Sequence, residues 1–337
     1  MDMQFFSKYT DEYKKNNKDK IGNIVKVGKS SRGIDYGEAL QKWKWNAIKN
    51  FFGLNEDAYK LFKQAATGLE LGRITQLNSS SLFAFLFFHT VSKDNRVRVK
   101  MEGFEDEFTN VAFEVRNTID KNTLTNEYKG RRPASHIDVV LYNEDTALLL
   151  ECKFSEYLEH YSPAPAKASR RAYEKFYKML FDDNGGIDGL SMGADSKNNT
   201  VITIKGAKDE SCYFDGLKQT IAHFMGTQGI LNSDNKHKKL DLESKKLHLA
   251  EVVFDFSKSN FLLDEGYKEA LEQYEKFHKR LCEKLTGLKD EIPNQRDVIV
   301  HSSLLRYQDN FTLKLPQVFA DLYQLSNRPN DTMSRIQ

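Results

Sequence analysis

The sequence predicts an α/β fold in which helices cover a central β-sheet on both faces. Residues 137–142 and 147–153 are two apolar strands separated by a short polar turn, so they form a β-hairpin. Both sides of this hairpin are apolar, which is typical of strands buried between two layers of helices. The elements around the hairpin follow the order helix, three strands, helix, strand, which supports the same architecture.

The elements before the hairpin are expected to be mostly helical. Residues 1–38 are polar and contain several glycines, which argue against long regular elements. Helical periodicity follows over residues 38–52 and 56–67. Serines cap the next helix, residues 79–91, which is apolar on most sides and is therefore expected to be buried. The alternation over residues 108–116 predicts the first strand of the sheet.

The elements after the hairpin continue the α/β pattern and end in helices. They are expected, in chain order, as a helix over residues 168–181, a short strand over 200–205, a helix over 212–226, a strand over 249–256, a helix over 265–285, a strand over 297–300 and a helix over 316–325. The chain is therefore divided into a mostly helical N-terminal extension (residues 1–75), an α/β core (residues 76–262) and a mostly helical C-terminal extension (residues 263–337).

The turn fixes the register of the hairpin. An even-length loop centred on Glu144 and Asp145 pairs Asp138 with Glu151, and paired residues have Cβ atoms about 5 Å apart. Because side chains alternate along a strand, Glu151 and Lys153 share a face and Cys152 points to the other. The two apolar faces are expected to be Ile137, Val139, Leu141, Leu148 and Leu150 on one side, and Val140, Tyr142, Ala147 and Leu149 on the other.

The polar end of the hairpin predicts a metal site. Two facing carboxylates repel each other unless a positive charge lies between them, and a divalent cation together with Lys153 supplies that charge. Acid-x-Lys triplets also begin at Glu12, Asp195, Asp234 and Glu243, but only Glu151-x-Lys153 ends a buried strand that follows an Asp-bearing strand. The alternative is that Glu151 and Lys153 are solvated residues where a strand leaves the core.

These residues resemble the signature of the PD-(D/E)XK phosphodiesterases, which have the restriction-endonuclease-like fold. Asp138, Glu151 and Lys153 match the signature in order and context, although Ile137 stands where the name of the motif has proline. Arg132-Pro133 and Lys153-Phe154-Ser155-Glu156 are similar to a bacterial subgroup of that superfamily. The resemblance covers about residues 80–256 and implies an αβββαβ core with a central mixed sheet flanked by helices.

The resemblance also implies an activity, a cofactor and a set of site residues. The expected activity is Mg²⁺-dependent hydrolysis of phosphodiester bonds, by a DNA endonuclease of restriction or defence type, with Mn²⁺ as a substitute. Asp138, Glu151 and the backbone carbonyl of Cys152 would hold the metal, and Glu114 would help to hold metal-bound water or a second ion. Lys153 would orient or deprotonate the attacking water. Gln219 would steady the substrate or Lys153. Glu114 and Gln219 could equally be an ordinary strand glutamate and an ordinary helix glutamine.

Basic residues near the expected site predict contacts with a nucleic-acid backbone. They are Arg131, Arg132, Lys167, Arg170 and Arg171. The alternative for each is an exposed charge on a solvated surface. Double-stranded DNA is the expected partner, and a homodimer is expected because two-fold DNA is commonly matched by a two-fold protein.

Composition limits the classes of protein to which the chain can belong. The chain has 337 residues, 39% of them hydrophobic, which suffices for a substantial core, and its net charge is +2. Its longest apolar run is too short for a membrane span, and three widely spaced cysteines favour a reducing cytoplasm. Three other classes stay open: a catalytically silent nucleic-acid-binding module on the same fold, a cysteine hydrolase that uses Cys152 or Cys212, and a structural subunit that binds a protein.

Overall fold

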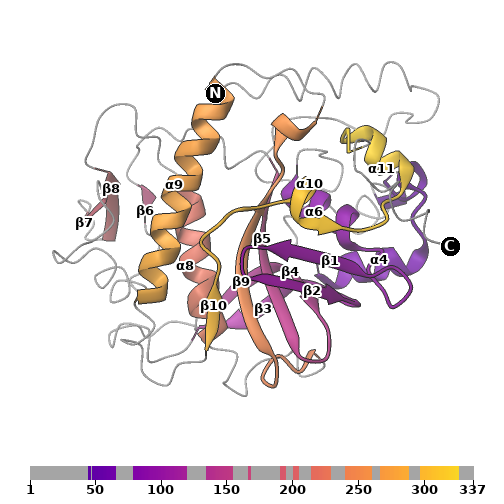
Figure 1. Cartoon of the computed structure of the whole chain (residues 1–337), viewed down its shortest axis with the longest axis horizontal. Helices are drawn as coiled ribbons and strands as arrows, with labels where there is room; N and C mark the ends of the chain where they lie inside the picture. The colour runs from indigo at the N-terminus through magenta and orange to yellow at the C-terminus, as the bar shows by residue number, and fades with distance from the viewer. Residues whose placement is uncertain are drawn as a thin grey trace.

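The predicted hairpin lies in the middle of a six-stranded mixed sheet (Figure 1). In this computed structural model the strand order is β10-β9-β5-β4-β3, and β11 continues the pairing along β9. Neighbours are antiparallel from β3 to β5, and β9 pairs parallel with β5, β10 and β11. The strands are β3 (Asn110–Thr118), β4 (Ala134–Tyr142), β5 (Thr146–Lys153), β9 (Lys246–Val253), β10 (Val298–Val300) and β11 (Leu305–Arg306).

The structure describes most of the sheet and its covering helices. The described residues are 45–46, 48–65, 79–119, 134–154, 166–167, 190–194, 200–204, 214–228, 240–259, 266–287 and 297–325. The predicted helix over residues 168–181 lies outside them. The division of the chain at residues 75 and 262 stays a prediction, although β10 and β11, from the C-terminal segment, join the central sheet.

The predicted register of the hairpin is confirmed. Val139 pairs with Leu150 and Tyr142 pairs with Ala147, as the turn at Glu144 and Asp145 requires. Every residue of β5 is buried, which agrees with a strand covered on both faces. The ladder between β4 and β5 ends at the pair of Val139 and Leu150, so the two strands separate just before Asp138 and Glu151 would meet.

One face of the sheet is covered by α6 (Ser80–Phe88), with α4 (Glu56–Ala65) and α11 (Gln317–Leu322) beside it (Figure 1). Ser79 caps α6 by accepting a hydrogen bond from the backbone N–H of Leu82. The helix is apolar all round and seven of its residues are buried, as expected for a core helix. Its Phe83 packs against Phe154 and Phe254, which follow β5 and β9.

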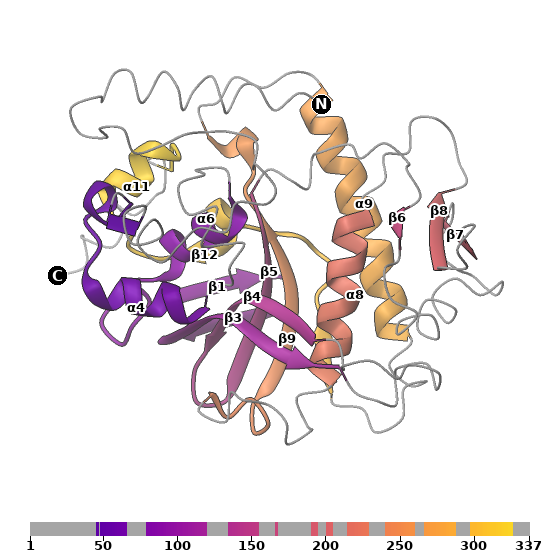
Figure 2. The ribbon, with the colours of Figure 1, turned by 180° about the vertical axis from the view of Figure 1, so that it is seen from behind.

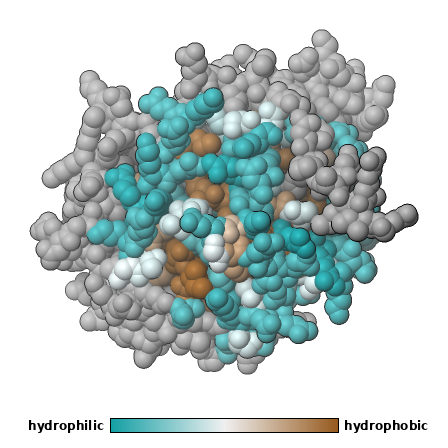
Figure 3. Space-filling model, in the orientation of Figure 1, coloured by the Kyte–Doolittle hydropathy of each residue, from teal (hydrophilic) through white to brown (hydrophobic). Residues whose placement is uncertain are grey.

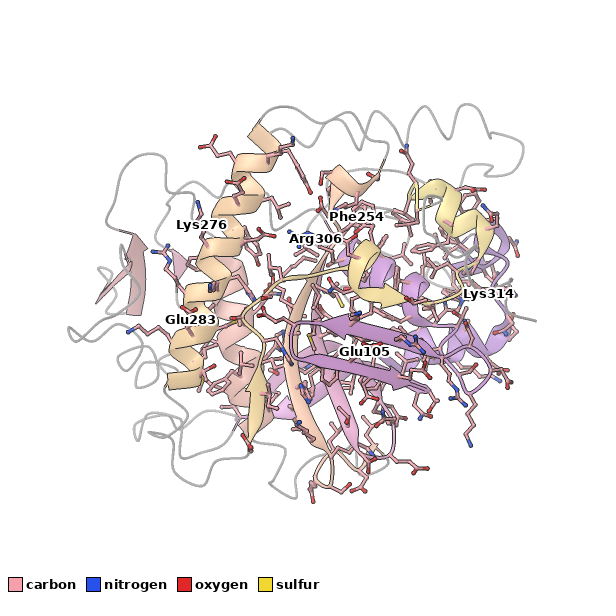
Figure 4. The ribbon with its side chains drawn as sticks, viewed as in Figure 1. Glu105, Phe254, Lys276, Glu283, Arg306 and Lys314 are labelled. Carbon is pink, nitrogen blue, oxygen red and sulfur yellow. The ribbon has the colours of Figure 1, made fainter. Side chains whose placement is uncertain are left out.

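The opposite face is covered by α8 (Phe214–Gln228) and α9 (Gly266–Gly287), which Figure 2 shows lying side by side. α8 contacts β3, β4 and β5, and α9 contacts α8 and β10. Both helices agree closely with their predicted ranges. Figure 4 shows Arg306, at the end of β11, near α9. Its guanidinium forms ion pairs with Glu275 of α9 and with Asp255, which follows β9.

Two small sheets lie outside the central sheet. β1 (Val97–Met101), β2 (Phe104–Phe108) and β12 (Phe311–Thr312) form an antiparallel sheet that the sequence did not predict. β1 alternates apolar and charged residues and its burial follows that alternation, whereas the three central residues of β2 are all charged. Charged side chains pair across the two strands, such as Arg98 with Glu107. β7 (Leu190–Ala194) and β8 (Thr200–Ile204) form a hairpin joined by β6 (Ala166–Lys167), and β8 matches the strand predicted there.

The remaining described elements are short. They are α10 (Tyr307–Asn310), the 3₁₀ helix η6 (Phe256–Lys258) and the helical residues 45–46 and 48–52, which lie within the helix predicted over residues 38–52. The predicted strand over residues 249–256 therefore begins earlier, at Lys246, and ends at Val253. On the face in Figure 3, hydrophilic side chains separate small hydrophobic areas. Within the described part of the chain, every helix is too short or too polar to traverse a lipid bilayer.

Candidate active site

Near Glu114, the side chains of strand β3 switch from one face of the sheet to the other. Phe113 packs against Phe85 of α6, with ring centroids 5.2 Å apart. Asn117 lies against Gly226 of α8, on the opposite face of the sheet. Residues four apart in a regular strand share a face, so the alternation reverses between these two positions. Glu114 lies between them with a φ of 49°, in the left-handed region that non-glycine residues rarely adopt.

Strand β4 shows the same reversal at Asp138. Val139 belongs to the core around α6, whereas Ser135 contacts His223 of α8. The ladder between β3 and β4 has no pair formed by Glu114 and Asp138, although pairs are present on either side of them. The prediction that Ile137 shares a core face with Val139 is therefore not met: Ile137 is buried outside the cluster that contains Val139. A one-residue irregularity is enough to exchange the faces of a strand.

Asp138 lies where β4 and β5 separate. Its Oδ2 accepts a hydrogen bond from the backbone N–H of Cys152 at 2.7 Å, so the side chain takes the place of a ladder hydrogen bond. Burial and the negative charges of Glu151 and Glu114 hold the pKa of Asp138 well above its usual range. The three predicted carboxylates therefore lie within electrostatic reach of one another.

Glu151 and Lys153 form a buried ion pair on the side of the sheet that α8 covers. They are 2% and 3% exposed, and the Lys153 amine donates to Oε1 of Glu151. The same amine donates to Oε1 of Gln219, and Oε2 of Glu151 contacts Nε2 of His223. Burial opposes ionisation of Glu151, but the charges of Lys153 and His223 lower its pKa to about 2. Glu151 is thus an ionised carboxylate with both oxygens engaged.

Helix α8 supplies two of these contacts from one face. Gln219 and His223 are four residues apart, so they are neighbours on the helix surface. Gln219 contacts Lys153, which is one of the two partners expected for it. Gln219 is exposed and therefore lies at the rim of the site. His223 is 4% exposed, and the sequence pointed to it only through the face that it shares with Gln219.

A second buried polar cluster adjoins the site, and the sequence did not indicate it. Glu251 of β9 is the register partner of Glu151. Its carboxyl accepts hydrogen bonds from Tyr274 of α9 and, at 3.3 Å, from Thr220 of α8. Burial raises the pKa of Glu251 to about 7. A small cavity between α8, α9 and the sheet is lined by both glutamates and by His223. In the sequence, the one trace of this cluster is an acidic residue, Glu251, inside an apolar strand.

The donor set of the site fits a hard divalent cation. The carboxylates of Asp138 and Glu151 and the carbonyl of Cys152 are the oxygen ligands that Mg²⁺ prefers. Burial and, after it, the negative charges of Glu151 and Glu114 raise the pKa of Asp138, and a cation would offset the repulsion among these carboxylates. Among the described residues, no three or more His, Cys, Asp or Glu side chains are arranged around one metal position. Glu151 would bind an ion through a lone pair that Lys153 and His223 do not occupy.

The other predicted residues lie apart from this cluster or outside the described residues. Cys152 belongs to the core around α6, and burial together with the charge of Asp138 raises its thiol pKa well above the usual range, which opposes a nucleophilic role. Lys167 lies in β6, where only the backbone is described. Cys212, Arg131, Arg132, Arg170 and Arg171 fall outside the described residues.

Comparison with known proteins identifies a family for this chain. A family model with the description "Restriction Endonuclease associating with ARP" matches residues 8–261. Comparisons with curated proteins and with solved structures gave no significant match. The matched segment includes the hairpin, α8 and β9, and with them Asp138, Glu151, Lys153, Gln219 and His223. The chain therefore belongs to this family of restriction-endonuclease type.

Proposed function

We propose that the chain is a divalent-metal-dependent nuclease of the PD-(D/E)XK type that hydrolyses phosphodiester bonds, with double-stranded DNA as its substrate. The observation that carries the proposal is the convergence of Asp138, Glu151 and Lys153 where β4 and β5 separate. The family supports a restriction-type endonuclease and a nucleic-acid substrate. The metal, the choice of DNA and the roles of individual residues belong to the proposal.

Asp138, Glu151 and the carbonyl of Cys152 would hold Mg²⁺, or Mn²⁺ in its place, and Glu114 would add negative charge nearby. A bound ion of this kind lowers the pKa of a water molecule and offsets the charge that grows on the phosphoryl oxygens. The backbone N–H of Cys152 fixes one oxygen of Asp138, so the other oxygen is the one that Asp138 would offer to a ligand.

Lys153 would act on the reacting groups directly. Its amine is held by Glu151 and Gln219, so its position is set before a substrate arrives. A buried ammonium next to the scissile phosphate stabilises the anionic transition state and can orient the attacking water. Gln219 has a supporting role, because its carbonyl oxygen limits the directions in which the amine can turn.

The runner-up is a nucleic-acid-binding module that keeps the fold without catalysis. One observation favours it: both oxygens of Glu151 are engaged by Lys153 and His223, an arrangement that is complete without a cation. Such a module would bind DNA equally well with and without Mg²⁺ and would leave the DNA intact. Metal-dependent turnover therefore separates the two functions.

The test uses the full chain on circular, linear and single-stranded DNA, with Mg²⁺ and with a chelator. Cleavage that requires Mg²⁺ and is lost in Asp138→Asn supports the nuclease. Glu243→Gln is the matched control, because Glu243 begins another acid-x-Lys triplet but is exposed. Cleavage that persists in Asp138→Asn, or DNA binding without any cleavage by the wild type, contradicts the proposal. Cleavage of both strands is expected to require a homodimer or two successive nicks.

A further inference from the structure

We propose that His223 is a positioning residue of this site, which fixes the Glu151 carboxylate and is itself fixed by Ser135. The inference rests on the proposed function and extends it to a residue outside the Asp138, Glu151 and Lys153 signature. Nε2 of His223 contacts Oε2 of Glu151, and Nδ1 lies 3.2 Å from the Ser135 hydroxyl oxygen. All three residues are at most 4% exposed, so water does not replace these partners.

The partners determine which ring nitrogen carries the proton. An ionised carboxylate can only accept hydrogen bonds, so Nε2 of His223 must be the donor to Glu151. The Ser135 hydroxyl can both donate and accept, so it satisfies Nδ1 in either state of the ring. The imidazole is therefore held at both ends, and a hydrogen bond from a neighbouring group of this kind orients a metal-binding side chain.

The irregular strands bring Ser135 to this position. Because the alternation of β4 reverses near Asp138, Ser135 faces α8 while Val139 faces α6. Gly226 permits the close approach of the helix, since a Cβ at this position would lie 2.5 Å from the Ser135 hydroxyl oxygen. The backbone geometry that separates β4 from β5 at Asp138 is thus coupled to the contact that orients Glu151.

This arrangement limits how Glu151 can bind a cation. Each carboxylate oxygen has two lone pairs, and His223 and Lys153 each engage one oxygen of Glu151. An ion would therefore bind through a remaining lone pair, whose direction these two partners set. Without His223, Glu151 would keep the ion pair with Lys153 but lose the contact that sets its orientation.

The inference is tested by titrating Mn²⁺ into the full chain and following the free ion by electron paramagnetic resonance. His223→Ala is expected to weaken Mn²⁺ binding by about 10- to 100-fold, the range for partners that orient metal ligands. His223→Gln keeps a side-chain N–H and is expected to restore most of the affinity. Ser135→Ala is expected to produce a smaller loss in the same direction, and it serves as the test if His223→Ala does not fold.

Two readouts separate an orienting role from a purely structural one. Thermal unfolding is measured for each variant, since a structural role alone would lower stability and leave the Mn²⁺ affinity of the folded protein unchanged. The ring ¹⁵N signals of His223 are recorded in wild type and in Glu151→Gln, with Glu243→Gln as the control. If Nε2 donates to Glu151, its signal is expected to change in Glu151→Gln and to stay the same in Glu243→Gln.

The outcomes distinguish this inference from the proposed function. Wild-type binding of Mn²⁺ with unchanged affinity in folded His223→Ala and Ser135→Ala overturns the positioning role and leaves the nuclease proposal intact. Wild-type protein that binds no Mn²⁺ at Glu151 and cleaves no DNA overturns the proposed function, and the inference fails with it. A weakened His223→Ala that His223→Gln rescues supports the inference.

Discussion

Gly226 of α8 lies so close to Ser135 of β4 that no side chain fits between them. A Cβ built on Gly226 would come within 2.5 Å of the Ser135 hydroxyl oxygen and 3.0 Å of its Cβ. His223 is one turn earlier in α8, so this contact sets the height of the helix above the sheet where it reaches Glu151. The packing of one glycine is thus connected to the geometry of the candidate site.

Gly226→Ala is expected to weaken both stability and cleavage. An added methyl group in a tight contact costs about 1–3 kcal/mol, because the helix must shift or Ser135 must turn. The shift would move Gln219 and His223 away from Lys153 and Glu151, so the DNA cleavage rate should fall more than the loss of folded protein explains. Urea unfolding and the cleavage rate at a temperature where the variant stays folded check this expectation.

Gly287→Ala is the control for that variant. Gly287 ends α9, and a Cβ there would meet nothing within 4 Å. The substitution should leave cleavage unchanged and alter stability by well under 1 kcal/mol. Equal losses in the two variants would show that the contact of Gly226 with Ser135 has no special importance.

The sequence predicted the centre of the site because a single local feature determined it. The short turn at Glu144 and Asp145 sets the pairing of Val139 with Leu150, and the alternation then gives Glu151 and Lys153 a common face. The residues that surround this pair come from distant parts of the chain. Their contacts depend on how helices pack on the sheet, which no local pattern encodes.

The reversal at Glu114 was not predictable from the residue types. Strand alternation assumes regular backbone torsions, and nothing in the sequence indicates that a glutamate adopts a positive φ. The same limit applies to Glu251: burial in one strand was predictable, but its partners Thr220 and Tyr274 come from two helices. Backbone irregularity and long-range polar contacts therefore account for what the sequence analysis missed.

Glu151→Gln and Lys153→Met should both abolish cleavage for different reasons. Glutamine removes a charged metal ligand, so Mn²⁺ affinity should fall together with the rate. Lys153 holds no metal in the proposed mechanism and its positive charge opposes a nearby cation, so its loss should keep or raise the Mn²⁺ affinity. The rate should fall by a hundredfold or more, about 3 kcal/mol of transition-state stabilisation. Isothermal titration and single-turnover cleavage distinguish the two variants.

The controls for this pair are Glu243→Gln and Lys245→Met, which alter another acid-x-Lys triplet of the chain. The Lys245 amine donates to the backbone carbonyl of Glu144 on an exposed turn. Neither control should change the rate or the metal affinity. Near-normal cleavage by Lys153→Met would contradict a catalytic role for Lys153 and favour the binding module.

Replacing Glu114 by glycine should have opposite effects on stability and activity. Its φ of 49° costs roughly 1 kcal/mol for a residue with a Cβ, and glycine adopts this torsion without that cost. Glu114→Gly should therefore keep or raise the free energy of unfolding while it removes a carboxylate near Asp138. If the carboxylate serves the site, cleavage falls in the glycine variant and in Glu114→Gln, which keeps the strained backbone. Unchanged cleavage in both variants would show that Glu114 is an ordinary strand residue.

The pair of His248 and His301 predicts a loss of stability in mild acid. Nδ1 of His248 and Nε2 of His301 are 2.8 Å apart, and the rings stack with centroids 5.1 Å apart. Burial lowers the pKa of each to about 4, and the positive charge of Lys246 contributes. The folded pKa lies below the unfolded value of about 6.5, so the unfolded chain binds more protons in between. This contribution to stability is therefore present above about pH 6.5 and is lost as the pH falls toward 4.

The test compares wild type with the double variant His248→Gln, His301→Gln by urea unfolding at pH 7, 6 and 5. Other groups also titrate in this range: the pKa of His278 is lowered to about 4, which adds to the acid loss, and the raised pKa of Glu251 opposes it. Because both proteins share these groups, the difference between their slopes isolates the histidine pair. The free energy of unfolding of wild type should fall more steeply from pH 7 to pH 5 than that of the variant. Parallel slopes would mean that the two histidines are as easily protonated in the folded protein as in the unfolded chain.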